Sequence, residues 1–292
     1  MKLTAEDKRK IEAYRKTLDQ YEKPSVTADI VALRPSFGKL RDDQWRENPK
    51  FSLEILMIRR GAWPYEGFWA LPGGFIQGPK NESVEEGAAR ELREETGLKA
   101  RTLIPVGVFS KRGRDMRAWI ISNAFVSVHH LGEGGKVKGG DDARSAEWLR
   151  IENPEIGAGH FSIPFCAPLS SEPLFTLSGS YQDEELGGGR VLAVDDNPLA
   201  FDHGEIIASA FLRLLSFDIR KLVFFFLPEK FTLSEYIGVY QYFTGNEIEP
   251  GNIPNFRRQL TEKKNPLLEV CEGEYEDSGR AHPTAKLYRR KQ

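Results

Sequence analysis

One acidic stretch, GGFIQGPKNESVEEGAARELREETGL at residues 73–98, gathers residue types that bind cations. Within it, Ser83 and Glu86 have the spacing of a capping box, and Gly97 is typical of a helix C-terminus. We therefore expect a helix from about residue 84 to about residue 96. The chemistry of the stretch then depends on which way the side chains of this helix face.

The phase of the expected helix turns three carboxylates toward the interior. At about 100° per residue, Val84 and Leu92 belong to one apolar stripe, and Glu91, Glu94 and Glu95 fall within an arc of about 100° that partly overlaps it. Such carboxylates repel one another and lose hydration, so they need shifted pKa values or a compensating cation. An all-carboxylate site suits Mg²⁺ or Mn²⁺. The alternative, a salt-bridged surface helix, leaves the inward phase unexplained.

The composition sets limits on the scaffold that positions these carboxylates. With 292 residues, 40% of them hydrophobic and 29% charged, the sequence is typical of a globular protein of about two domains. The charged N-terminus, and the absence of an apolar run near the roughly 18 residues of a membrane span, predict a cytoplasmic protein with no membrane partner. Cys166 and Cys271 predict neither a disulfide framework nor a metal motif. The formal net charge of -2 gives no general attraction to nucleic acid, so DNA binding requires a local patch.

Hydrophobic patterning predicts the elements around the acidic helix. Segments rich in β-branched and aliphatic residues predict strands at 26–35, 51–60, 102–109 and 118–129. Charge and periodicity predict helices at 4–21 and 202–217, and LVFFFL at 222–227 predicts a buried strand. A stretch rich in Pro, Gly and Ser at about 153–198 predicts an inserted hairpin or a long excursion. The last 65 residues predict a separate small unit.

Glu82, the seven residues after it and RELREETGL at 90–98 resemble the signature box of the Nudix hydrolases. The resemblance implies an α/β fold in which helices cover both faces of a mixed sheet, an α/β/α sandwich. It also implies that the box holds a divalent metal ion against a diphosphate. It also implies that Glu82 pairs with Arg90 to brace the helix. Seven residues separate Gly74 from Glu82, where the family usually has five, so we expect the loop to differ more than the helix.

The same resemblance implies the roles of the remaining box residues. Glu94 and Glu95 correspond to the main metal ligands, and Glu91 corresponds to a further ligand or a base. Gly73 or Gly74 corresponds to the residue whose backbone carbonyl faces the metal. The chemistry implied is hydrolysis of a pyrophosphate, because the metal neutralises the substrate and lowers the pKa of the attacking water.

Two segments near the box resemble Nudix members that act on ADP-ribose, namely GFWALPGGF at 67–75 and GRDMRAWIISNAFVSV at 113–128. Arg114 and Arg117 are candidates to clamp phosphate, and Asp115 is a candidate to fix the arginines or a ribose hydroxyl. A turn with surface charges is the alternative for these three residues.

Other candidate substrate residues are aromatic or acidic. The aromatic candidates can stack on a base or belong to the core; they are Tyr65, Phe68 and Trp69. A later acidic segment, GGDDARSAEW at 139–148, resembles the part of many Nudix enzymes that holds a catalytic base, and its candidates are Asp141, Asp142 and Glu147. Asp142 is also a candidate substrate contact.

The C-terminal residues predict a winged helix-turn-helix domain. FTLSEYIGVYQYFTG at 231–245 contains a capping box and a glycine stop, NFRRQLTEKK at 255–264 predicts a second helix, and two strands follow. The basic candidates for phosphate contact are Arg257, Arg258, Lys263, Lys264 and Arg280. From residue 228 onward ten acidic residues equal ten lysines and arginines, so a protein-binding or dimerising domain is the alternative.

The order of these parts resembles the Nudix-related transcriptional regulators of NAD metabolism. The matching segments are EKPSVTADIVAL, the box, LAFDHGEII, LPEKFTLSE and NFRRQL. The resemblance implies a homodimer in which ADP-ribose or a related nucleotide binds residues 1–202 and changes how residues 203–292 engage double-stranded DNA. Three functions follow as expectations: a ligand-responsive regulator, a pyrophosphohydrolase whose C-terminal domain serves dimerisation or protein binding, and a protein with both activities.

Overall fold

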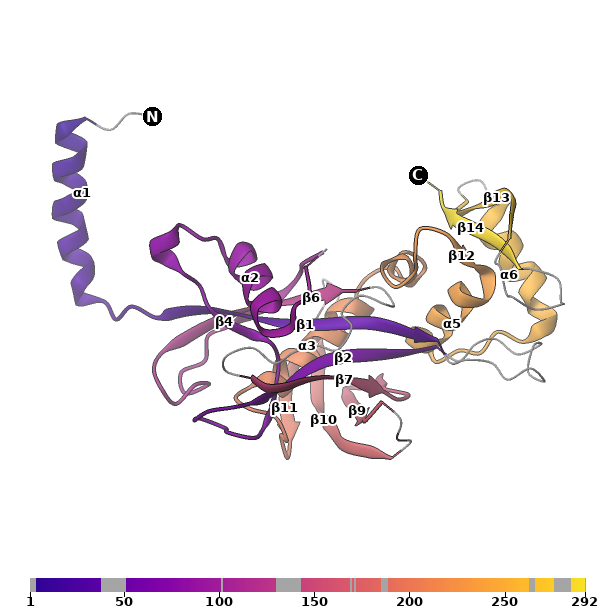
Figure 1. Cartoon of the computed structure of the whole chain (residues 1–292), viewed down its shortest axis with the longest axis horizontal. Helices are drawn as coiled ribbons and strands as arrows, with labels where there is room; N and C mark the ends of the chain where they lie inside the picture. The colour runs from indigo at the N-terminus through magenta and orange to yellow at the C-terminus, as the bar shows by residue number, and fades with distance from the viewer. Residues whose placement is uncertain are drawn as a thin grey trace.

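The computed structural model describes residues 4–37, 51–100, 102–129, 143–168, 170, 172–184, 189–262, 266–275 and 285–291. Its centre is a large mixed sheet with the order β11-β10-β9-β7-β2-β1-β6-β5 (Figure 1). β1 runs parallel to β6 and antiparallel to β2. The long strands are β1 (Ser25–Phe37), β2 (Phe51–Arg60), β5 (Ile104–Phe109), β6 (Ile120–Val128), β7 (Ala143–Ile151), β9 (His160–Cys166), β10 (Pro173–Asp183) and β11 (Gly189–Asp195); the short ones are β3 (Trp69–Ala70), β4 (Gly73–Phe75) and β8 (Glu155–Gly157).

Helices cover both faces of this sheet, which confirms the predicted α/β/α sandwich. Successive side chains of a strand point to opposite faces, and in β1 Ile30 packs in the cluster under α2 (Val84–Thr96), whereas Val31 and Leu33 pack in the cluster around α3 (His203–Leu215). The bounds of α2 match the helix expected from the capping box and the glycine stop.

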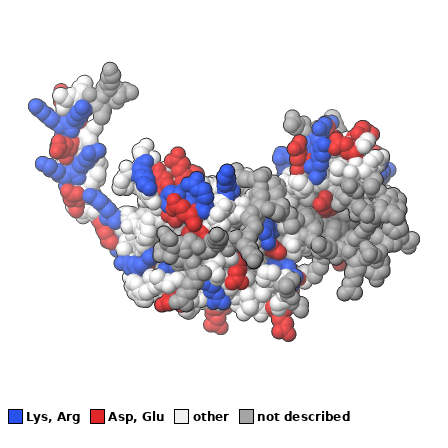
Figure 2. Space-filling view, in the orientation of Figure 1, with Lys and Arg blue, Asp and Glu red and all other residues white. Residues whose placement is uncertain are grey.

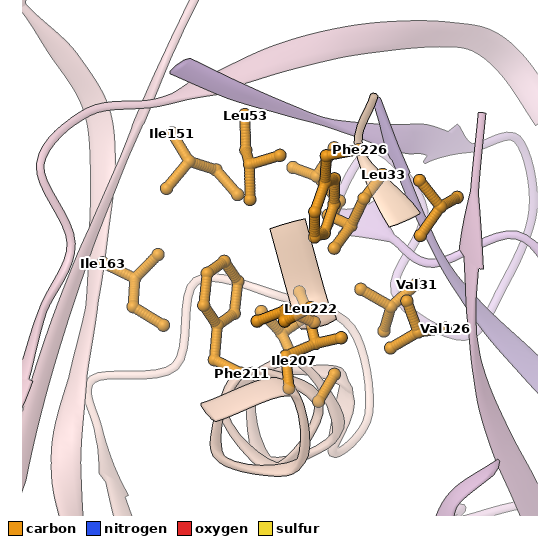
Figure 3. Packing of buried hydrophobic residues seen from close by; sticks show 14 of the residues in the cluster. Val31, Leu33, Leu53, Val126, Ile151, Ile163, Ile207, Phe211, Leu222 and Phe226 are labelled. Atoms are coloured by element: carbon orange, nitrogen blue, oxygen red, sulfur yellow. The ribbon is translucent and has the colours of Figure 1, made fainter. Parts of the chain in front are cut away.

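Helix α3 lies inside the larger hydrophobic cluster. Most of its residues are buried, as expected for a helix with apolar side chains on nearly all sides. In Figure 3, Phe211 and Ile207 of α3 face Val126, Leu53 and other strand residues, and Leu222 and Phe226 lie among them. The helix expected at 202–217, which was grouped with the DNA-binding residues 203–292, is therefore packed against the large sheet.

Two segments differ from the expectation or refine it. LVFFFL at 222–227 was expected to be a strand, but its first four residues end α4 (Ile219–Leu222) and form the 3-10 turn η4 (Val223–Phe225), and Phe226 and Leu227 follow as a bend. A short apolar run does not distinguish a buried strand from a buried helix, and the capping Asp218 supplies the helix start. Of the two alternatives for 153–198, the hairpin is the better description, because β10 and β11 pair antiparallel; β9 also pairs with β7, so the segment extends the main sheet.

The C-terminal residues confirm the predicted winged helix domain. A small sheet pairs β12 (Phe231–Thr232) with β14 (Lys286–Arg290) and β14 with β13 (Leu268–Tyr275). Between β12 and β13 the chain forms α5 (Leu233–Thr244) and α6 (Ile253–Thr261), and the short turn η5 (Pro250–Asn252) leads into α6. At the other end, α1 (Ala5–Thr17), with the short turn η1 (Leu18–Gln20), stands away from the sheet (Figure 1). None of the described helices is both long and apolar enough to cross a bilayer.

Candidate functional site

Arg90 forms hydrogen bonds with three carboxylates of the acidic stretch. Its Nε donates to Glu82 at 2.8 Å, and its Nη1 donates to Glu91 at 2.7 Å and to Glu94 at 2.9 Å. The Arg90 side chain is only 11% exposed. The hydrogen bond from Arg90 lowers the pKa of Glu82 to about 2, so this carboxylate is ionised at neutral pH. The expected bracing pair is therefore present, within the mixed-charge surface that Figure 2 shows over α2.

Strand β4 approaches the carboxylates of α2 through its glycines. The Gly73 amide donates to Glu95 at 2.9 Å. A Cβ on Gly74 would lie 2.5 Å from the Glu91 carboxyl carbon, closer than any side chain allows. A glycine at this position therefore lets the backbone of β4 reach the carboxylates.

The donor set has the chemistry of a divalent metal site, although the carboxylates do not converge. Three carboxylates beside an exposed backbone are hard oxygen ligands suited to Mg²⁺ or Mn²⁺. Burial raises the pKa of Glu91, which a cation would offset. In the part of the chain that the structure describes, however, no three such side chains are placed to hold one ion, since Arg90 Nη1 lies between Glu91 and Glu94.

A pocket opens beside the carboxylates. Its walls come from β1, from β4, from the segment around Arg114 and from the segment that leads into α3. It brings together five of the residues expected at the site, namely Gly74, Glu95, Arg114, Asp115 and Arg117. The fold thus brings Gly74 and Arg117, about 40 positions apart in the sequence, to the same pocket.

Arg114 is held by a carboxylate from the far side of the pocket. Its Nε and Nη2 donate to both oxygens of Asp202 at 2.7 and 2.6 Å, and its side chain is 5% exposed. Burial alone lowers the pKa of Arg114, but the hydrogen bonds and charge of Asp202 outweigh burial and the net shift is upward. A phosphate that binds Nε or Nη2 of this guanidinium has to compete with Asp202, and Asp29 also lies 3.5 Å from Nη2.

Arg117 is the more accessible of the two arginines, with 34% of its side chain exposed. Its Nη2 donates to Asp115 at 2.7 Å, and Asp115 is buried. Burial raises the pKa of Asp115, but the hydrogen bonds from Arg117 prevail and lower it. The guanidinium also lies 5.7 Å from the Phe75 ring and 5.4 Å from the Phe201 ring. Asp115 thus fixes Arg117, as expected.

The aromatic candidates divide between wall and core. Trp69 is buried under the Arg59 guanidinium at 3.9 Å and does not line the pocket, so in this structure it belongs to the core. Tyr65 packs edge-on against Phe68 and Phe201, whose ring does line the pocket. Tyr65 and Phe68 therefore support a pocket wall from behind.

The remaining candidates lie outside the pocket or outside the described residues. Glu147 is exposed on β7, bonded to Ser145 at 3.4 Å, and does not line the pocket. Arg257 and Arg258 are exposed on α6, at the face expected to meet DNA. The candidates outside the described residues are Asp141, Asp142, Lys263, Lys264 and Arg280.

Comparisons with known proteins agree with this geometry. Residues 45–163 match the NUDIX domain family, and residues 223–290 match the NrtR DNA-binding winged helix domain. The chain joins a Nudix domain to an NrtR-type winged helix domain. The crystal structure of a MutT/nudix family protein from Enterococcus faecalis covers 100% of both chains, with 25% identity and a TM-score of 0.62.

Curated relatives are similar to different parts of the chain. An ADP-ribose pyrophosphatase from Methanocaldococcus jannaschii is 40% identical over 111 residues, which are 38% of this chain and 63% of that protein. The chain thus spans less than two thirds of that relative. The ADPR responsive transcriptional repressor NtrR from Acinetobacter baylyi is 24% identical over 244 residues, covering 83% of this chain and 74% of the repressor.

Several pocket residues of the Nudix domain were not foreseen. Asp29 accepts a hydrogen bond from Ser122 and lies 3.7 Å from His203 Nε2. The His203 Nδ1 accepts from the Leu71 amide at 2.9 Å, so the ring is neutral with its proton on Nε2, toward Asp29. Burial lowers the pKa of His203, in keeping with that neutral form. A charged residue within the aliphatic run VTADIVAL was the available signal for Asp29.

Proposed function

We propose that this protein is a DNA-binding regulator whose Nudix domain binds ADP-ribose or a related nucleoside diphosphate derivative. The observation that carries the proposal is the pocket that combines Glu95 of the box with Arg114, Asp115 and Arg117, in a chain that also has a winged helix domain. The names of the two curated relatives, an ADP-ribose pyrophosphatase and an ADPR-responsive repressor, support the same ligand.

The arrangement of charges suits a diphosphate. Arg117 is partly exposed and oriented by Asp115, so it is placed to donate to a phosphate oxygen without losing much side-chain freedom. The Phe201 ring offers an apolar wall for a ribose or base. Replacing Arg117 with alanine should therefore weaken ADP-ribose binding by about 1.5 to 3 kcal/mol, which calorimetry measures directly.

Hydrolysis is the second candidate function, and the complete set of box residues favours it. Glu91, Glu94 and Glu95, with the Gly74 carbonyl, would hold Mg²⁺ or Mn²⁺ after Glu91 and Glu94 exchange Arg90 for the ion. A bound divalent ion would neutralise the diphosphate and lower the pKa of a water molecule. Glu82 holds Arg90 through its own hydrogen bond at 2.8 Å, separately from Glu91 and Glu94.

On the DNA side, α6 carries the proposed contacts. Arg257 and Arg258 are exposed, and no carboxylate within the described residues forms an ion pair with either. We propose a homodimer that places two such helices in the major groove, at half-sites about one helical turn, or a multiple of it, apart.

The deciding experiment is fluorescence anisotropy on DNA from upstream of the protein's own gene, with and without ADP-ribose. We expect binding that falls steeply with salt and changes with ADP-ribose. Replacing Arg257 and Arg258 with alanine should flatten the salt slope by up to about two units. Absence of DNA binding at low salt, together with rapid ADP-ribose hydrolysis, would leave the enzyme with an accessory dimerisation or protein-binding domain.

A further inference from the structure

Helix α3 begins differently from the other helices that have a capping-box sequence. Among the helices that the structure describes, three start at a closed capping box. In such a box the N-cap side chain accepts from the backbone amide three residues later, and the side chain of that residue accepts from the N-cap amide; the boxes are Thr4–Asp7, Ser83–Glu86 and Thr232–Glu235. Asp202 and Glu205 have the same spacing at the start of α3. Yet no side-chain hydrogen bond caps α3.

The cap of α3 is open because Asp202 is engaged elsewhere. Both of its carboxylate oxygens accept from Arg114, at 2.7 and 2.6 Å, so neither faces the amide of Glu205. Its backbone, at φ -99° and ψ 24°, is also far from the extended conformation that Ser83 adopts at φ -75° and ψ 167°. The ion pair and the open cap are thus two aspects of one conformation.

The backbone next to Asp202 is strained. Phe201 has a φ of 54°, in the left-handed region that a bulky side chain rarely adopts. This conformation holds the Phe201 ring over the guanidinium groups of Arg60 and Arg117 at the pocket wall. Strain of this kind persists only where other contacts impose it, and the Asp202–Arg114 pair is one such contact.

The other half of the box is also unused. The Glu205 carboxylate is half-buried, and within the described part of the chain no hydrogen bond or ion pair to it is found. In a closed box the same carboxylate would accept from the Asp202 amide. The residues for a closed cap are therefore in place.

We propose that Asp202 is a two-position switch, which pairs with Arg114 in one state and caps α3 in the other. A diphosphate that takes the Arg114 guanidinium releases Asp202, which then closes the box with Glu205. The backbone at residues 201 and 202 turns toward the extended region, and the Phe201 ring moves with it. This regulation rests on the proposed function, because the anion that competes with Asp202 is the nucleotide ligand.

The switch connects to the winged helix domain through the body of α3. Phe211 of α3 packs in the same buried cluster as Leu222 and Phe226 (Figure 3). The Phe226 ring lies 5.1 Å from that of Phe243 on α5. A change at the first turn of α3 therefore acts on an element that lines the pocket and shares a buried hydrophobic cluster with residues of the DNA-binding domain.

Amide hydrogen exchange of the first turn of α3, residues 203–206, tests the switch. Saturating ADP-ribose should slow exchange there about tenfold in the wild type, because a closed cap stabilises the first turn. Arg114→Gln should give the same protection without ligand, since it removes the charged two-point contact that holds Asp202. Adding Asp202→Ala to Arg114→Gln is the matched control and should remove the protection. A thermal melt of each variant confirms that it is folded.

The outcomes separate this proposal from the proposed function. If calorimetry shows that ADP-ribose binds and the first turn of α3 exchanges at an unchanged rate, the switch is refuted and the ligand stands. If ADP-ribose does not bind, the proposed function fails, and the comparison of Arg114→Gln with the double variant still decides the switch. Equal exchange in those two variants would also overturn it.

Discussion

The contact between Gly74 and Glu91 allows a sharp test of the geometry around the box. In Gly74→Ala, the new Cβ would lie 2.5 Å from the Glu91 carboxyl carbon and 2.6 Å from both of its oxygens. Glu91 can relieve this contact only by giving up its hydrogen bond with Arg90 at 2.7 Å and by moving a side chain that is only 15% exposed. Overpacking of this kind typically costs about 1–3 kcal/mol. We therefore expect Gly74→Ala to lower the free energy of unfolding by about that amount.

Gly78 provides the matched control, because it lies four residues after Gly74, in the short turn Gly78–Lys80 that follows β4. A Cβ on Gly78 meets nothing within 4 Å, and its φ is not in the left-handed region. Gly78→Ala should leave the free energy of unfolding unchanged or raise it by about 0.4–1 kcal/mol, since alanine restricts the unfolded chain. Urea unfolding monitored by tryptophan fluorescence measures both variants.

A double-mutant cycle identifies the cause of the loss. If the Glu91 carboxylate is what the new Cβ meets, Gly74→Ala should cost much less in a chain that already carries Glu91→Ala. The reasoning is refuted if Gly74→Ala and Gly78→Ala have equal stability. It is also refuted if the cost of Gly74→Ala stays the same in the Glu91→Ala background.

Three further predictions follow from the same structure. Glu95→Gln should lower any Mg²⁺-dependent ADP-ribose hydrolysis by about 10²-fold or more, whereas the exposed Glu85→Gln should do little in the same product assay. Burial lowers the pKa of His203 below its usual 6.5, so as the pH falls the unfolded state takes up this proton before the folded state does. The free energy of unfolding should therefore stay constant above about pH 6.5 and decrease below it. In urea titrations across this pH range, His203→Gln should make that decrease smaller. Phe226→Ala should lower the free energy of unfolding by about 3–5 kcal/mol, because Phe226 is fully buried in the large hydrophobic cluster that also contains α3. All five tryptophans precede residue 149, so tryptophan fluorescence reports whether the loss is felt in the large sheet. An unchanged unfolding midpoint would contradict this prediction.

Local signals explain which elements could be predicted from the sequence. Helix α2 has its expected bounds because Ser83, Glu86 and Gly97 fix its ends within a few residues of chain. The run at 222–227 has no such signal, since its apolar residues suit either element, and tertiary packing around α3 decides in favour of a helical turn. Hydrophobic periodicity therefore predicts an element and its bounds where capping residues also mark its two ends.

The candidate site shows the same limit over longer distances. Arg114 and Arg117 were identified as anion-binding candidates from their own segment, and both line the pocket. The partner that restricts Arg114 is Asp202, which lies 88 residues further along the chain. No local pattern reports such a pairing, because it depends on how α3 enters the sheet.

The ends of the large sheet bear on how copies of this protein meet one another. An open strand edge offers unpaired backbone groups on which another chain can polymerise. Here the edge strand β5 contains Pro105 and a register shift before Gly107, and the opposite edge, β11, carries Arg190 and Asp195 near its two ends. Both edges also lie against α3. These features disfavour edge-to-edge pairing between copies of the protein, so we expect a specific assembly to use other surfaces.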